Sequence, residues 1–242
     1  MGDERKTAVV TGGSQGIGAA ICDGLLARGY RVVCLARRPP HRQDPNLIGM
    51  EVDLADVAAT RRVCAQIQEL GPTTIVHNAG VIRAALLEDV DLRDLDHLVA
   101  LYFSATILLT QACLPAMKAA AYGRVVIVSS RAAVGLATRT AYTATKSGLI
   151  GLARTWALEL GPHGITVNVV APGPIPTQMF VDVVPTGSDR EANLIKSLPM
   201  RRLGTVGDVA RAVLYFSDPE NGFVTGQTLF VCGGASVGYL QI

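Results

Sequence analysis

The chain has 242 residues, of which 49% are hydrophobic, and this composition suits one large α/β domain with a substantial core. Its 22 basic and 20 acidic residues are scattered along the chain and leave a net charge of +2, which argues against a nucleic-acid binder. Five widely spaced cysteines are typical of buried thiols in a reducing compartment, so we expect a cytoplasmic protein without a disulfide framework.

Short apolar runs rich in β-branched residues recur along the chain and alternate with segments of helical periodicity. Six strands are predicted, at residues 7–11, 31–36, 73–77, 124–129, 165–170 and 227–231. A strand such as 125–128 is apolar on both faces, which requires helices above and below a parallel sheet. We therefore expect a doubly wound, parallel α/β sheet that forms a single domain over residues 1–242.

Helical periodicity predicts helices at residues 16–28, 57–70, 92–120, 141–160 and 206–216. Residues 174–203 are the least regular stretch, rich in proline, glycine and charge, and we interpret them as a flap near the strand ends where ligands bind. The first residues are charged, and no apolar run reaches the roughly 18 residues that span a bilayer. Membrane insertion is therefore not expected.

A glycine-rich turn, Thr-Gly-Gly-Ser-Gln-Gly-Ile-Gly, lies at residues 11–18 between the first predicted strand and helix. Glycines there let the backbone approach a pyrophosphate at the helix N-terminus, so we expect a dinucleotide, although such a turn can also be purely structural. The glycine spacing differs from the more common G-x-G-x-x-G pattern. The expected contacts come from Gly12, Ser14, Gln15, Gly16, Ile17 and Gly18.

The second predicted strand is followed by Arg37 and Arg38, where NAD-binding sheets usually hold an acidic residue on the ribose 2′-hydroxyl. Guanidinium groups suit a 2′-phosphate, so the sequence predicts NADP(H), unless the two arginines merely solvate a turn. The other expected cofactor contacts are Asp53 and Leu54 beside the adenine, and Asn78, Ala79 and Gly80 after the next core strand.

Tyr142 and Lys146 stand four residues apart in a predicted helix, so their side chains share one helix face. A phenol exchanges protons poorly at neutral pH unless a nearby cation lowers its pKa. The pair therefore predicts an acid/base site, and the alternative is an ordinary solvated helix face.

Residues 11–18, Asn78-Ala79-Gly80, Ser129-Ser130, Tyr142 with Lys146, and Pro172-Gly173 together resemble the ordered motifs of the classical short-chain dehydrogenase/reductase family. The likeness covers nearly the whole chain and is strongest to 3-oxoacyl-carrier-protein reductases and related ketoreductases. It implies a Rossmann-type fold and an NADP(H)-dependent oxidoreductase that transfers hydride between nicotinamide and a small-molecule ketone or secondary alcohol. The alternative is a non-catalytic, nucleotide-sensing protein with the same fold.

By this resemblance, Tyr142 exchanges a proton with the substrate oxygen, and Lys146 lowers the Tyr142 pKa and binds the nicotinamide ribose. A serine at the end of the fifth strand stabilises the substrate oxygen. We choose Ser130 from the motif, although Ser129 has the family's usual separation of 13 residues from the tyrosine. The residues expected to hold the nicotinamide carboxamide are in the segment Pro172, Gly173, Ile175 and Thr177.

Some positions depart from the family pattern. The family often has an asparagine in the fourth helix, where it supports a water chain to the lysine, and Tyr102 stands there in this chain. Tyr102 is thus either a participant in another relay or a packing residue. Ala121 and His163 stand where carrier-protein reductases show arginines, which disfavours a carrier-bound substrate. The flap's Met179 and its neighbours suit a medium-sized, partly apolar substrate.

The resemblance also implies a homotetramer formed through residues 95–117, 147–160 and 223–242, whose apolar side chains could alternatively fill the monomer core. The histidines His77, His97 and His163 lack a metal-ligand spacing, so no metal is predicted.

Overall fold

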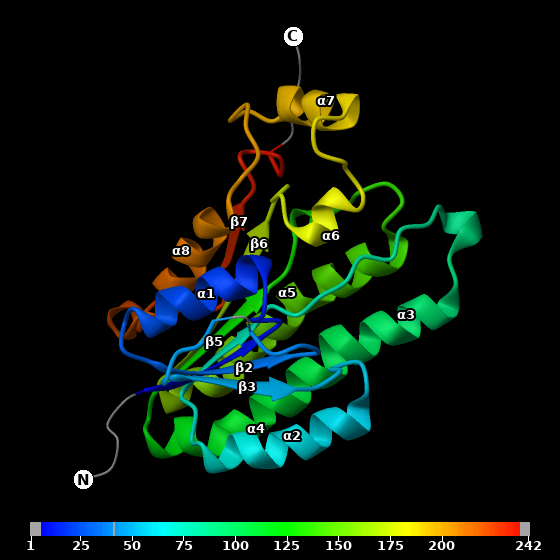
Figure 1. Cartoon of the computed structure of the whole chain (residues 1–242). Coiled ribbons are helices and arrows are strands. Elements are labelled where there is room, and N and C mark those ends of the chain that lie inside the picture. Colours follow the sequence, from blue (N-terminus) through cyan, green and yellow to red (C-terminus); the bar gives the residue numbers. More distant parts are fainter. Residues whose placement is uncertain (1–5, 41, 238–242) are drawn as a thin grey trace.

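The computed structural model describes residues 6–40 and 42–237 (Figure 1). Over these residues the core is a seven-stranded parallel sheet in the order β3-β2-β1-β4-β5-β6-β7. The strands are β1 (Thr7–Thr11), β2 (Arg31–Ala36), β3 (Leu47–Glu51), β4 (Thr74–His77), β5 (Gly123–Val128), β6 (Ile165–Pro172) and β7 (Thr228–Val231). The strand order reverses between β1 and β4, and sheets of this class bind ligands beyond the strand ends at such a point.

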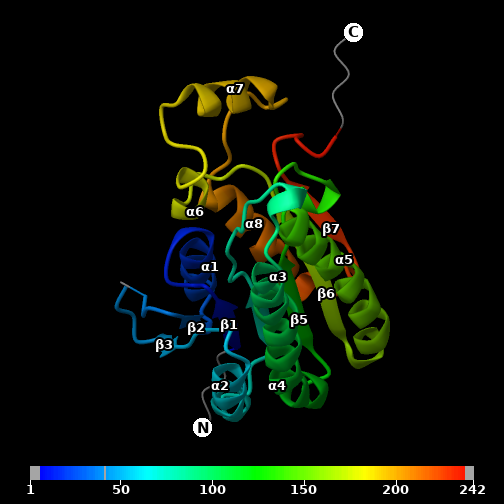
Figure 2. The same ribbon diagram turned by 90° about the vertical axis from the view of Figure 1, so that its right-hand side faces the viewer.

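Helices cover both faces of the sheet, as Figures 1 and 2 show. One layer contains α1 (Gly16–Leu26) and α8 (Val206–Ser217), and the other contains α2 (Val57–Glu69), α4 (Ala105–Ala119) and α5 (Thr140–Leu160). Side chains alternate between the two cores: Val125 and Ile127 of β5 face the second layer, and Val126 faces the first. The doubly wound parallel sheet predicted from the sequence is confirmed.

One strand was missed, because the edge strand β3 reads Leu-Ile-Gly-Met-Glu and has no fully buried residue, so it lacks the apolar run typical of the central strands. The single helix predicted at 92–120 is also wrong in detail. It consists of α3 (Leu92–Val99), a π-helical turn at Ala100–Ser104, and α4. Within the described residues, Leu92–Ala119 is the one helical run long and apolar enough to cross a membrane, but half of its most apolar window is buried, as in a core helix.

The flap, residues 174–203, lies beyond the C-terminal ends of the strands and contains two short helices, α6 (Gln178–Val181) and α7 (Asp189–Ser197) (Figure 2). These helices were not predicted, since each is short and surrounded by proline and glycine. The base of the flap is tied to the sheet side by a hydrogen bond from the Met200 N–H to the Gly233 carbonyl, 3.2 Å long.

The glycine-rich turn after β1 depends on the absence of side chains. Gly12 and Gly16 have φ angles of +66° and +57°, in the left-handed region that favours glycine. A Cβ atom on Gly18 would lie 2.1 Å from the Gly12 carbonyl oxygen, so the first turn of α1 packs directly against the turn that precedes it.

This turn is locked to the loop after β4 across the reversal of strand order. The Thr11 Oγ1 accepts hydrogen bonds from the Asn78 and Ala79 N–H groups, at 2.8 and 2.9 Å. In return, Asn78 Nδ2 donates to the carbonyls of Thr11 and Gly12, at 3.0 and 3.2 Å. Asn78 therefore shapes the turn rather than only making room beside it.

The packing predicts opposite effects for two glycine-to-alanine changes. Gly18→Ala should lower the free energy of unfolding by about 1–3 kcal/mol, because its methyl group meets an immobile backbone carbonyl. Gly151→Ala, in α5 with nothing within 4 Å of the added Cβ, should raise it by up to about 1 kcal/mol through helix propensity. Urea denaturation measures both, and equal stability of Gly18→Ala and the wild type would contradict the packing.

Candidate active site

Helix α5 places Tyr142 and Lys146 one turn apart against the end of β5. Only 8% of the Tyr142 surface and 3% of the Lys146 surface are exposed, so the alternative of a solvated helix face is wrong. The Lys146 Nζ donates a hydrogen bond of 2.9 Å to the Val128 carbonyl and lies 5.7 Å from the centre of the Tyr142 ring. The pair is thus held inside the fold, beside the last residue of a central strand.

Burial changes the acidity of both groups. It lowers the pKa of Lys146 to about 7 and raises the pKa of the Tyr142 phenol above its usual value. A hydrogen bond with Ser130 and the charge of Arg139 act against the rise in the Tyr142 pKa. Arg139 is thus a cation that opposes the rise, whereas the expected effect of Lys146 on the Tyr142 pKa stays a prediction. Arg139 was not selected from the sequence; it precedes Tyr142 by three residues, at the start of α5.

The two candidate serines point to different partners. Ser129 is buried, and its Oγ donates a 2.8 Å hydrogen bond to the Lys146 carbonyl, so it joins β5 to α5. Ser130 Oγ accepts from the Ala132 N–H at 3.1 Å and interacts with the Tyr142 hydroxyl. The structure therefore brings Ser130, and not Ser129, to the tyrosine hydroxyl.

The turn after Ser130 is fastened to α5 by two hydroxyl groups. Thr143 Oγ1 donates to the Ala132 carbonyl at 3.1 Å, and Ser147 Oγ donates to the Ala133 carbonyl at 2.6 Å. These bonds fix the distance between Ser130 and the helix that carries the tyrosine. Ser130 therefore reaches the tyrosine although it stands 12 residues before Tyr142, one fewer than the family's usual 13.

Tyr102 lies in the π-helical turn before α4, directly beneath the lysine. Its ring centre is 4.0 Å from Lys146 Nζ, and it meets the Tyr142 ring edge-on with centroids 6.1 Å apart. The Tyr102 hydroxyl donates to the Val81 carbonyl at 2.8 Å and accepts from the Val81 N–H at 2.9 Å. Both hydrogen-bonding functions of the hydroxyl are thus used by backbone, and Tyr102 contacts the lysine through its ring.

The predicted cofactor residues meet at one edge of the sheet, because the carboxyl ends of parallel strands lie together. Arg37 and Arg38 follow β2, and both side chains are exposed and in no ion pair within the described residues. Asp53 follows β3, is exposed, and accepts a 3.0 Å hydrogen bond from the Ala55 N–H, whereas Leu54 is buried. Gly80, the last residue of the Asn78-Ala79-Gly80 segment, follows β4 at the same end of the sheet.

The start of α1 is open to an anionic ligand. Gln15 is the N-cap residue of α1, and its side chain accepts no hydrogen bond from the first N–H groups of the helix. Ile17 lies in the first turn of the same helix. On the far side of this turn, a Cβ atom on Gly16 would lie 3.2 Å from the Thr177 methyl group. The segment after β6 that is predicted to hold the nicotinamide carboxamide therefore borders the glycine-rich turn. Ser14 lies in the same turn.

The remaining residues of that segment form its base. Pro172 ends β6, and a Cβ atom on Gly173 would lie 2.6 Å from Cys232 Cα, so the chain leaves the sheet closely packed against the residue after β7. Ile175 is buried in the core of the α1 and α8 layer. This packing fixes the base from which the flap extends over the site.

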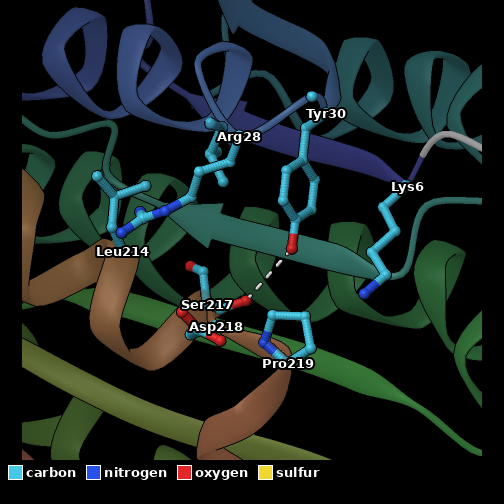
Figure 3. Close-up of a pocket in the computed structure, with 9 residues that line it drawn as sticks. Lys6, Arg28, Tyr30, Leu214, Ser217, Asp218 and Pro219 are labelled. Carbon is cyan, nitrogen blue, oxygen red and sulfur yellow. Dashed lines mark hydrogen bonds between the residues drawn. The ribbon is translucent and has the colours of Figure 1, made fainter.

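A separate cavity of about 450 Å³ lies near the N-terminal ends of β1 and β2, between the C-terminal end of α1 and the C-terminal end of α8 (Figure 3). Lys6 and Arg28 approach it from two sides, and the Tyr30 hydroxyl donates to the Ser217 carbonyl at 3.4 Å. None of the predicted site residues lines this cavity. It is therefore distinct from the Tyr142 site.

The histidines and cysteines have structural surroundings. His77 Nε2 lies 2.8 Å from Thr110 Oγ1, and burial lowers its pKa to about 3, so it is neutral at pH 7. All five cysteines are free thiols, and four are buried. Within residues 6–40 and 42–237, no group of three or more His, Cys, Asp or Glu side chains is arranged to hold a metal ion.

Comparisons with known proteins identify the family of the chain. The family model for short chain dehydrogenase matches residues 6–187. The chain is 36% identical to the (2S)-[(R)-hydroxy(phenyl)methyl]succinyl-CoA dehydrogenase subunit BbsD of Thauera aromatica, over 98% of this chain and 99% of that protein. It is 35% identical to the 3-oxoacyl-(acyl-carrier-protein) reductase FabG of Escherichia coli (strain K12), over 97% of this chain and 98% of that protein.

Solved structures show the same relationship. A blue fluorescent protein from a metagenomic library, in complex with NADPH, superimposes with a TM-score of 0.82 at 32% sequence identity, over 95% of this chain and 97% of that chain. The range matched by the family model includes the glycine-rich turn and the Tyr142 site. The chain therefore belongs to the short chain dehydrogenase family.

Proposed function

We propose that this protein is an NADP(H)-dependent ketoreductase that interconverts a ketone and a secondary alcohol. The observation that carries the proposal is the cluster of Ser130, Tyr142 and Lys146 at the edge of the sheet where the glycine-rich turn lies. One relative reduces 3-oxoacyl groups and another dehydrogenates a hydroxyl-bearing acyl-CoA, which supports the same pair of functional groups. The whole chain acts as one catalytic unit, with residues 174–203 as its substrate flap.

The residues present fit a nicotinamide dinucleotide. The turn around Gly12, Gly16 and Gly18 leaves a cradle that side chains would fill, and the uncapped start of α1 offers N–H groups to a pyrophosphate. Arg37 and Arg38 would bind a 2′-phosphate at the end of β2, which favours NADP(H) over NAD(H). When bound, the cofactor supplies the hydride that is transferred to or from the substrate carbon.

The side chains of this protein would transfer the proton and stabilise the negative charge that develops on the substrate oxygen. Tyr142 is protonated at neutral pH because burial raises its pKa, so it is ready to donate a proton during reduction. Ser130 accepts from the Ala132 N–H, and its O–H, which interacts with Tyr142 in this structure, would donate to the substrate oxygen when substrate binds. Lys146 would hold the nicotinamide ribose, and the Tyr102 ring and the Val128 carbonyl fix its ammonium in place.

Tyr102 does not support the sensor alternative. Its unusual presence in the fourth helix was the only feature in favour of a non-catalytic protein, yet its ring supports the lysine and its hydroxyl is bound to Val81. A protein that only senses nucleotide has no need of a half-buried serine beside a buried tyrosine and a buried lysine.

The substrate is better described as a small ketone or a CoA thioester than as a carrier-bound chain. Ala121 and His163 are exposed on adjoining loops and do not provide the two arginines that would attract an acidic carrier protein. The flap instead offers half-buried Phe180 and buried Val184 as an apolar wall for the substrate.

Removing the phenol should abolish most turnover. Tyr142→Phe should reduce kcat by about 10²- to 10⁴-fold, because it removes the proton donor and keeps the ring packing. The rate of NADPH oxidation at 340 nm with a panel of ketones measures the loss, and NADPH binding should be unchanged. A variant with full turnover would show that another group transfers the proton.

The cofactor preference should depend on the two arginines after β2. Arg37→Gln combined with Arg38→Gln should weaken NADPH binding by about 10- to 100-fold through loss of charge-assisted hydrogen bonds, with little effect on NADH. Dissociation constants from fluorescence titration test this, with the exposed Arg61→Gln in α2 as the matched control. Equal effects on NADPH and NADH would exclude a 2′-phosphate site.

Assembly into a homotetramer is part of the proposal, as is a cytoplasmic location, for which the free thiols argue. Apolar side chains are exposed on the two expected helices and near the C-terminal segment, including Ile107 on α4, Leu158 on α5 and Phe223. Of the expected segment 223–242, residues 238–242 lie outside the described part of the chain.

Light scattering should give a mass four times the 25.4 kDa of the chain. Leu158→Asp, at a side chain that is 82% exposed in the single chain, should reduce this mass, whereas Leu87→Asp, in the 3-10 helix Leu87–Asp89 before α3, should not. A monomer mass for the wild type would overturn the assembly.

A further inference from the structure

Arg139 is a buried cation without an ionic partner beside Tyr142. It is the N-cap residue of α5, and 6% of its surface is exposed. Its Nη1 donates to the carbonyl and the hydroxyl of the neighbouring Thr138, at 3.0 and 2.7 Å. No described residue forms an ion pair with Arg139 or a hydrogen bond with its Nε or Nη2. A buried charge left in this state is unfavourable, so the surroundings are suited to an anion from outside the chain.

The charges around Arg139 strengthen this conclusion. Burial and the nearby cation of Arg190, which α7 brings in from the flap, both lower the Arg139 pKa. Two of the three acidic side chains of the flap are used elsewhere: Asp182 accepts from the Gln178 amide, and Glu191 accepts from the Gly187 N–H. The third, Asp189, forms no ion pair with Arg139 within the described residues. The flap therefore places a second positive charge near Arg139 and no carboxylate against it.

The unpaired side of Arg139 has the geometry of a carboxylate receptor. Nε and Nη2 form one edge of the planar guanidinium, where two parallel N–H groups match the two oxygens of a carboxylate. Arg139 directly precedes α5 and Tyr142 is the third residue of that helix, and the charge of Arg139 acts on the Tyr142 phenol. An anion bound to Arg139 would consequently lie close to a substrate carbonyl that contacts Tyr142.

We propose that Arg139, assisted by Arg190, is a carboxylate-binding subsite, and that the substrate is a short oxo acid or the corresponding hydroxy acid. The inference rests on the proposed ketoreductase function and narrows its substrate class. The carboxylate orients the carbonyl toward Ser130 and Tyr142, and Arg190 of α7 adds a second positive charge near the same group.

Matched pairs of acids and esters test the subsite. The probes are pyruvate, acetoacetate and 4-oxopentanoate, each compared with its methyl ester, with NADPH oxidation followed at 340 nm. At least one acid should exceed its ester by about 10- to 100-fold in kcat/KM, the range expected for a buried, charge-assisted pair. A wild-type preference for all three esters would overturn the proposal.

Substitutions then assign the effect to the arginine. Arg139→Gln should remove the advantage of the acid over its ester in kcat/KM, mainly through the KM of the acid, while its effect on the Tyr142 pKa changes acid and ester turnover alike. Arg139→Lys should recover part of the advantage as a charge without the fork. Arg190→Gln, on the exposed flap, should weaken acid binding severalfold. Arg154→Gln, exposed on the same helix, is the control. Equal losses for acids and esters in Arg139→Gln would show a structural role only.

A binding measurement separates this inference from the proposed function. If neither these probes nor neutral ketones are reduced, the ketoreductase function fails, and thermal unfolding with NADP⁺ and 4-oxopentanoate decides the subsite. A rise in Tm in the wild type that Arg139→Gln abolishes supports the subsite. No rise in the wild type, or an equal rise in both proteins, overturns it.

Discussion

The attachment of α5 to the end of β5 determines the rest of the site. Ser129 and Lys146 form the attachment from both directions: the serine hydroxyl donates to the lysine carbonyl, and the lysine ammonium donates to the Val128 carbonyl. The turn after Ser130 is then tied to the same helix by Thr143 and Ser147. Since β5 is a central strand buried on both faces, the reacting groups are as rigid as the core itself.

The sequence predicted the parts that short motifs and apolar runs encode. The buried strands, the glycine-rich turn and the Tyr142 and Lys146 pair all appear as residue patterns within one element, and the sheet joins them because parallel strands end at the same edge. The edge strand β3 and the helices of the flap carry no such pattern, because they are half exposed and their conformation depends on contacts made by other segments.

Interactions between residues in different elements were the hardest to foresee. Tyr102 was recognised as unusual, but its contacts with Val81 and Lys146 depend on a π-helical turn that periodicity does not reveal. Arg139 was overlooked because an arginine at a helix start is ordinary. It is distinguished by its burial and by the absence of an ion pair with any residue that the structure describes. The electrostatic balance at Tyr142 therefore required the three-dimensional arrangement.

The position of the Tyr102 hydroxyl limits which side chain can occupy position 80. A Cβ atom on Gly80 would lie 2.7 Å from this oxygen, so the loop after β4 can accommodate tyrosine in the fourth helix only if position 80 has no side chain. Evolution could enlarge residue 80 only after shortening residue 102, and the two positions should covary among descendants of this sequence.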